Sequence, residues 1–229
     1  MKATIANFVR SRPRFADLLR DCRGLAATEF AIIAPIMLLV FFGTVEFCSA
    51  VAIDRKVTLT ARTLTDLTSQ QSSSANGNTY NNVAVIADAD LQNNFTAGIG
   101  IMAGYDPSPT KATLSEIYVD STGVAKIQWS KAAIIASGAT QATLVASTRN
   151  PDDDVTSIVP AQLLVKKTYL IFSEVTYRYV PTIGYVLKNS VNLNDVSYTR
   201  PRQALCIVYG TPPNGLPNLT NPGNQCPQT

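Results

Sequence analysis

The stretch that decides the fold runs from Gly24 to Val45 and reads GLAATEFAIIAPIMLLVFFGTV. It holds a single charged side chain, that of Glu29, near the start of an otherwise apolar run. A helix this long and apolar is able to cross a bilayer. A charged side chain within such a span costs about 2.5–3.5 kcal/mol on insertion scales. A segment that only anchors the chain has no need of this carboxylate, so Glu29 indicates a further role.

The net charge of +3 is unevenly distributed along the 229 residues. Residues 1–24 hold six basic and two acidic side chains and carry +4, which leaves 13 basic against 14 acidic side chains, or −1, for the rest. Basic residues beside a membrane span stay on the cytoplasmic side, which places the C-terminal part outside. Because the basic residues belong to this leader, they do not indicate nucleic-acid binding, and no nucleic-acid partner is expected.

The stretch from Gly24 to Phe47 resembles the N-terminus of the TadE/TadG-like minor pseudopilins of the tight-adherence (Flp) type IV pilus system. The shared pattern is a Gly before small residues, a Glu-Phe pair, an apolar run interrupted by Pro, a Gly and a second Glu-Phe pair. In this chain the pattern is formed by Gly24, Glu29-Phe30, Pro35, Gly43 and Glu46-Phe47. The rest of the chain is similar more loosely, through residues 118–130 and 175–181.

The resemblance implies a minor pseudopilin that a prepilin peptidase cuts between Gly24 and Leu25, within a signal that includes Glu29 and Phe30. Gly suits the position before the cut because its backbone approaches an enzyme closely. Glu29 would then act in assembly by meeting the new N-terminal amine of a neighbouring subunit, so that two buried charges compensate each other. The implied partners are the peptidase, sister pseudopilins, the major pilin, the pilus platform proteins and the inner membrane.

The expected fold class is α+β, with a long N-terminal transmembrane and amphipathic helix followed by a pilin-like antiparallel sheet domain. We expect a basic cytoplasmic leader over 1–24, a single inner-membrane helix over 25–53, a periplasmic α+β domain over 54–211 and a Pro/Asn-rich tail over 212–229. Beyond the membrane segment, apolar residues recur at three- and four-residue steps, which predicts one buried helix face. That face comprises Ala50, Ile53, Val57, Ala61, Leu64 and Leu67.

Further elements follow from periodicity and turn residues. We predict a loop over 69–82 and a helix over 83–102 that Asp88 or Asp90 caps. Strands are predicted over 112–119 and 124–129, joined by a turn at 120–123, then one or two strands over 162–180. The last two strands are predicted over 182–187 and 196–200.

Two cysteines, Cys206 and Cys226, lie in the exported part, where an oxidising compartment favours a disulfide. Closing a loop of about 20 residues contributes roughly 3 kcal/mol on the entropic model. The alternative is a pair of free thiols in the tail. A zinc site is not expected, because the chain has no His and no paired Cys spacing.

Carboxylates also cluster, at Asp152-Asp153-Asp154 and at Asp88 and Asp90. Such groups can hold Ca²⁺, but no spacing matches a calcium-binding loop. A solvated acidic loop is the favoured interpretation, and no metal or cofactor is expected.

Several alternatives stay open at this point. Ala50-Val51-Ala52 resembles a signal peptidase I site, and cutting there would release a soluble domain. Glu46 reaches the outer interface, marks a subunit contact or simply ends the membrane segment. The alternative function is an anchored or secreted periplasmic binding protein with no pilus role. The chain lacks His, a Gly-x-Ser-x-Gly motif and a phosphate loop, so we expect no catalytic site.

Overall fold

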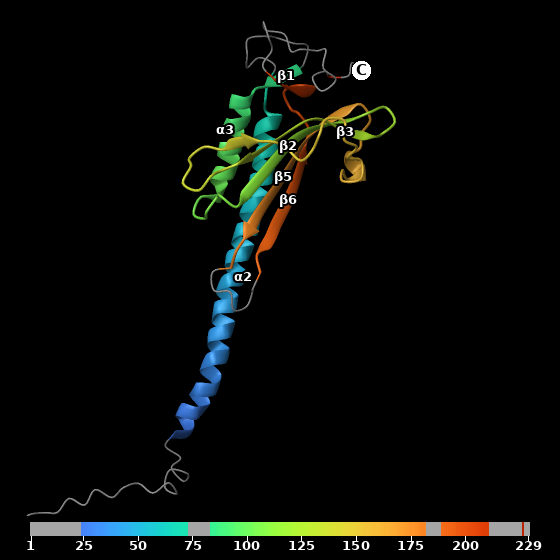
Figure 1. The fold of residues 1–229 in the computed structure, drawn as a ribbon. Helices are drawn as coiled ribbons and strands as arrows, with labels where there is room; N and C mark the ends of the chain where they lie inside the picture. The colour runs from blue at the N-terminus through green and yellow to red at the C-terminus, as the bar shows by residue number, and fades with distance from the viewer. Residues whose placement is uncertain (1–23, 73–82, 182–188, 211–225, 227–229) are drawn as a thin grey trace, which may run out of the picture. The chain divides into compact units, whose positions relative to one another are not determined.

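The computed structural model describes residues 24–72, 83–181, 189–210 and 226. Contacts divide the chain into two compact units, one up to Val45 and one from Glu46 onward. The helix α2 (Leu25–Ser69) has 45 residues and contributes to both units (Figure 1). The first unit therefore consists, where described, of the apolar start of α2, and the second is an α+β domain.

A five-stranded antiparallel sheet forms the frame of the second unit, in the order β4-β3-β2-β5-β6. Its strands are β2 (Thr110–Val119), β3 (Ala125–Ile134), β4 (Thr143–Val145), β5 (Thr168–Tyr179) and β6 (Val191–Thr199). The β2–β3 hairpin turns where the sequence predicts it, because the Asp120 carboxylate accepts backbone N–H groups of Thr122, Gly123 and Val124. Gly123 supplies the positive φ of 100° that the turn requires. The α+β fold class, with a long apolar helix before an antiparallel sheet, is thereby confirmed.

A second, two-stranded sheet pairs β1 (Val83–Ile86) with β7 (Cys206–Tyr209) in parallel. The prediction of a helix from residue 83 is wrong in its first part, since α3 (Asp88–Ile99) begins only after β1. Val83–Ile86 is mostly buried and pairs with a segment near the C-terminus, so a long-range partner decides its structure. A short 3-10 helix, η2 (Gly100–Met102), follows α3.

Other predicted elements differ in extent. The predicted range 162–180 overlaps η3 (Ala161–Leu163) and contains the single strand β5, and residues 196–199 of the last predicted strand belong to the longer strand β6. β4 and β7 are additional strands that the periodicity does not mark. The predicted strand over 182–187 lies outside the described residues, as do residues 1–23 of the leader and all of the tail except Cys226.

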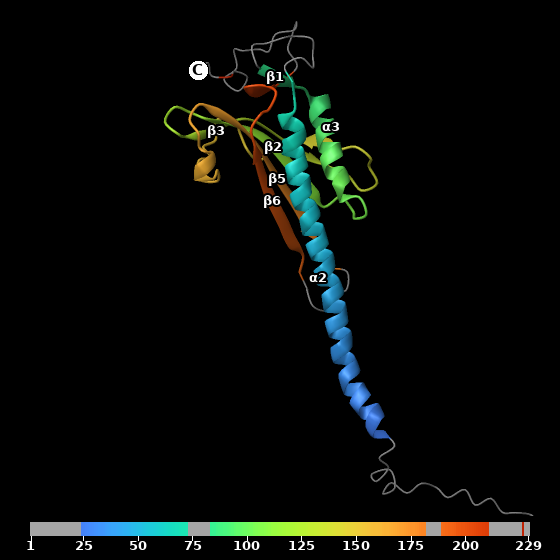
Figure 2. The same cartoon turned by 180° about the vertical axis from the view of Figure 1, so that it is seen from behind.

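Helices α2 and α3 lie side by side over one face of the sheet (Figure 2). Four residues of the apolar stripe predicted for α2 are buried there against α3 and the inner sheet face, whereas Ala50 and Leu67 are only half-buried. This main core includes Ile53, Val57, Ala61, Leu64, Leu91, Phe95, Ile99, Leu114, Ile171 and Val175. Ser173 on β5 donates its hydroxyl to the Ala61 carbonyl at 2.7 Å, which fixes α2 to the centre of the sheet.

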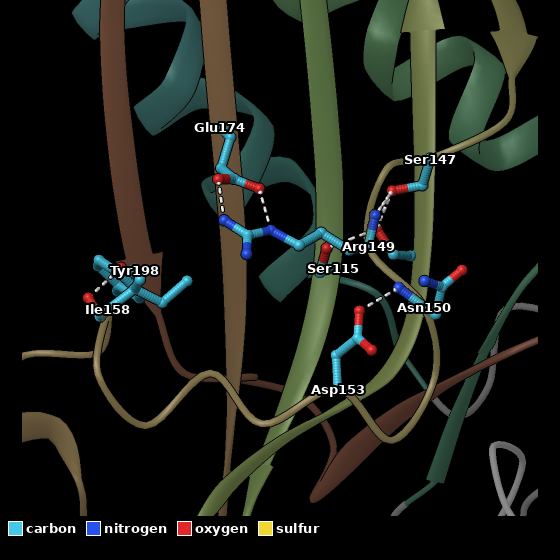
Figure 3. A network of polar contacts seen from close by, with 9 residues as sticks. Ser115, Ser147, Arg149, Asn150, Asp153, Ile158, Glu174 and Tyr198 are labelled. Atoms are coloured by element: carbon cyan, nitrogen blue, oxygen red, sulfur yellow. Dashed lines mark hydrogen bonds and ion pairs between the residues drawn. The ribbon is translucent and has the colours of Figure 1, made fainter.

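The segment 146–164 covers part of the opposite sheet face and closes a smaller core there. Its apolar members include Ile117, Ile127, Val155, Val159, Leu170 and Phe172. A polar network holds the segment in place (Figure 3): Arg149 makes a bidentate contact with Glu174, at 2.6 and 3.0 Å. Tyr198 on β6 donates its hydroxyl to the Ile158 carbonyl at 2.8 Å. These contacts attach a long connection that otherwise has little regular structure.

Candidate functional site

The apolar start of α2 exposes its side chains around the helix. Large apolar residues from Phe30 to Phe47 have exposed fractions between 40% (Phe42) and 70% (Phe30). They are Phe30, Ile32, Ile33, Ile36, Met37, Leu38, Leu39, Val40, Phe41, Phe42, Val45 and Phe47. Among the described residues, α2 is the one helix long and apolar enough to cross a membrane. An apolar surface of this extent requires lipid or other helices to cover it.

The predicted processing residues lie at the beginning of this apolar surface. Gly24 is exposed, and a Cβ built on it would have no atom within 4 Å. Leu25 is the first residue of α2, and Glu29 is exposed about one helical turn further on, beside the exposed Phe30. The four residues thus lie together at the start of α2, where Gly24, Glu29 and Phe30 are exposed.

Pro35 lies inside α2 and has no backbone N–H to donate to the carbonyl of Ala31. Further along, the Thr44 hydroxyl donates to the Val40 carbonyl at 2.8 Å, which satisfies the polar group of its side chain within the helix. In a hydrocarbon environment such internal satisfaction is required of each polar group. The Ala31 carbonyl is therefore a position where a neighbouring helix could contribute a donor.

Glu46 belongs to the globular domain. Its side chain is only 3% exposed, and its backbone carbonyl accepts the Tyr179 hydroxyl at 3.4 Å. The carboxylate therefore lies inside the second unit, and does not extend from the helix into surrounding solvent. The two acidic residues of the repeated Glu-Phe pattern are thus in opposite environments, Glu29 exposed and Glu46 buried.

Cys206, the first residue of β7, forms a disulfide with Cys226. Cys206 is buried beside Tyr169 and Val208, so the disulfide attaches Cys226 to the β1–β7 sheet. Cys48 is a free, exposed thiol on α2. Cys22 lies outside the described residues.

A buried carboxylate that the sequence reading did not single out joins β7 to the main sheet. Glu116 on β2 accepts the Ile207 N–H at 2.6 Å and the Trp129 indole N–H at 3.2 Å, while that indole also donates to the Ile207 carbonyl at 2.5 Å. Burial raises the pKa of Glu116 to about 8, although both hydrogen bonds act to lower it. The alternation of side chains along β2 could have indicated this burial. Glu116 lies two residues after the buried Leu114, so both side chains point to the same face of the sheet.

Four of the clustered aspartates accept hydrogen bonds from other residues of the domain. Asp88 accepts the Tyr209 hydroxyl at 2.6 Å, and Asp90 accepts the Ala87 N–H at 3.1 Å at the start of α3. Asp153 and Asp154 accept backbone N–H groups within their own loop. Within the part of the chain that the structure describes, no group of three or more His, Cys, Asp or Glu side chains is placed to hold a metal ion.

Comparison with known proteins gives one result for this chain. The family model described as TadE-like protein matches residues 24–64, which cover the exposed apolar surface and part of the buried stripe of α2. No match was found among curated proteins or among solved structures. The matched range contains each residue of the predicted processing signal. The chain therefore carries a TadE-like region over residues 24–64, which connects it with the tight-adherence (Tad/Flp) pilus system.

Proposed function

We propose that the chain is a minor pseudopilin that takes part in assembly of a tight-adherence pilus. The observation that supports this most is the position of Glu29, an exposed carboxylate at the start of the apolar part of α2, inside the TadE-like region. A carboxylate in a bilayer needs a compensating charge. The amine created by cutting after Gly24 would provide that charge on a neighbouring subunit.

The proposal includes processing and topology. A prepilin peptidase cuts between Gly24 and Leu25, leaving a single inner-membrane span with the globular domain in the periplasm. The span in this proposal ends near Val45, before the predicted limit at Ile53, which is supported by the burial of Glu46 and Ile53 in the second unit. Sister pseudopilins, the major pilin and the platform proteins are the partners of this state.

The experiment replaces Glu29 by Ala in the full chain and measures pilus output and co-purification with sister subunits. Membrane insertion should persist, since the change removes a costly group from the apolar segment. Association should weaken, because the partner amine loses its counter-charge. Asp54→Ala is the matched control, since it removes an exposed carboxylate of α2 beyond the apolar segment. Normal pilus output and normal co-purification in Glu29→Ala would show that the assigned role of Glu29 is wrong.

A further inference from the structure

The strand β6 forms one edge of the main sheet, since β5 is the one described strand that pairs with it. Helix α2 runs beside this edge (Figure 2), and the hydroxyl oxygens of Thr65 on α2 and Ser197 on β6 lie 3.0 Å apart. Next to this contact, a hollow of about 320 Å³ opens between the helix and the strand. It is lined from α2 between Arg62 and Asp66, from β6 between Ser197 and Thr199, and from Arg202. All of these residues belong to the second unit.

Two arginine side chains and one carboxylate line the hollow. Arg202 forms an ion pair with Asp66, and its main-chain N–H donates to the Ser69 carbonyl at 2.8 Å, which holds Arg202 beside α2. The second oxygen of the Asp66 carboxylate accepts the Gln70 side-chain amide at 3.0 Å. Arg62 is exposed, and its guanidinium has no ion-pair partner among the residues that the structure describes. The lining therefore has a net positive charge, and its one carboxylate is already engaged.

Tyr198 presents its main chain to the hollow. Its side chain is used on the opposite sheet face, where the ring stacks on Phe172 with centroids 4.7 Å apart and the hydroxyl donates to the Ile158 carbonyl. Two residues earlier, the Val196 N–H donates to the Asp195 carboxylate at 2.7 Å and so points away from β5. Main-chain N–H groups alternate in direction along a strand, so that of Tyr198 points out of the same edge. A free strand edge of this kind can pair with an extended segment of another chain.

The donors of the hollow match a carboxylate that is carried on a peptide. The free guanidinium of Arg62 offers a planar fork of N–H groups, which binds carboxylates through two parallel hydrogen bonds. Thr63 and Thr199 add hydroxyl groups to the lining. Two arginines against one aspartate leave a single positive charge, which balances one carboxylate, whereas a phosphate group carries about −1.5 to −2 at neutral pH. The outward main chain of β6 matches the main-chain groups of a peptide, which a small anion lacks.

We propose that the hollow between α2 and β6 binds a carboxylate side chain of a partner protein, carried on an extended segment that pairs with the free edge of β6. Arg62 receives the carboxylate, and Arg202, held by Asp66, forms the facing wall. The inference concerns the second unit alone. It therefore does not depend on cleavage after Gly24 or on the role of Glu29.

The test uses the full chain in detergent and a short fluorescent peptide with blocked ends, in which threonine and valine alternate around one central glutamate. Fluorescence anisotropy measures binding, and the same peptide with glutamine in place of glutamate is the reference. We expect the wild-type chain to bind the glutamate peptide several-fold more tightly than the glutamine peptide, and Arg62→Gln to remove this preference. Arg55→Gln is the matched control and should keep it. Arg55 is an exposed arginine of α2 that does not line the hollow, about 10 Å from Arg62 along the helix.

Two further glutamate peptides test the strand pairing, each methylated on one of the two alternating sets of main-chain nitrogens. An added strand pairs through one of its edges, so one methylated peptide should lose binding and the other should keep it. Equal behaviour of the two overturns the pairing. If inorganic phosphate also displaces the peptide completely, the hollow is a site for small oxyanions only.

The carboxylate site has its own contradicting results. Equal affinity of the wild-type chain for the glutamate and glutamine peptides overturns it, and so does an unchanged preference in Arg62→Gln. Each of these results leaves the proposed function standing, because the Glu29→Ala experiment tests that function separately.

Discussion

At the scale of single residues, Glu116 is a buried acidic side chain whose pKa lies well above its ordinary value. Its carboxyl is fully buried between β2, β3 and β7, and it bonds the backbone of a strand near the C-terminus. The chain contains no His, the side chain whose ordinary pKa lies between pH 5 and 8. Stability in that range therefore reports on Glu116.

The pH dependence has a definite sign. The folded-state pKa of Glu116 is about 8, above its ordinary value of 4.5, so the folded chain binds more protons than the unfolded chain between these values. The free energy of unfolding should then fall as the pH rises from about 4.5 to about 8. Glu116→Gln should flatten this slope, because the amide does not titrate but still accepts the Ile207 N–H. Urea unfolding of the detergent-solubilised chain at several pH values measures this slope of the free energy of unfolding against pH.

The matched control for this measurement is Asp120→Asn. Hydrogen bonds from Thr122 and Val124 lower the pKa of Asp120 to about 2, so its contribution is lost only in acid and the slope above pH 5 should not change. A Glu116→Gln variant with the wild-type slope between pH 5 and 8 would contradict the assignment.

At the scale of elements, the packing of α3 on α2 depends on a glycine. A Cβ at Gly98 would lie 2.7 Å from Cδ2 and 2.8 Å from Cγ of Leu64, a fully buried residue of the main core. Gly98→Ala should therefore destabilise the domain by about 1–3 kcal/mol, since Leu64 has to move within a packed core. Denaturant unfolding measures the change.

Gly100, at the end of α3, is the control for this prediction. It has no atom within 4 Å of a built Cβ and a helical backbone with φ −56°. Gly100→Ala should be neutral or stabilising by up to about 1 kcal/mol. Equal effects of the two substitutions would show that close contact between the helices does not limit the size of residue 98.

Local patterns predicted some elements and not others. The stripe of α2 and the β2–β3 hairpin follow from side-chain periodicity and from turn residues that act within a few positions. β1 and β7 were missed because their pairing joins segments more than 100 residues apart, and Val83–Ile86 alone fits a buried strand or helix equally well. The start of α3 at Asp88, with Asp90 bonding back to Ala87, agrees with the predicted cap even though the helix is shorter.

At the scale of the whole molecule, the two compact units differ in how much their sequence reveals. The first unit and the start of the second contain the TadE-like region, whose Gly, Glu and apolar run are contiguous and can be read directly. The sheet domain has no comparable motif, and its Glu116 cluster assembles residues from three separate strands. Such a cluster becomes visible only when the register of the strands is known.

The N-terminus of the mature protein tests the central claim most directly. In cells that contain the prepilin peptidase, N-terminal sequencing should find Leu25, and Gly24→Val should block the cut by adding bulk where the enzyme approaches the backbone. Gly43→Val is the control, since it changes a glycine of the same apolar run away from the cut. An intact Met1, or a mature protein that begins at Ile53, would contradict the pseudopilin assignment.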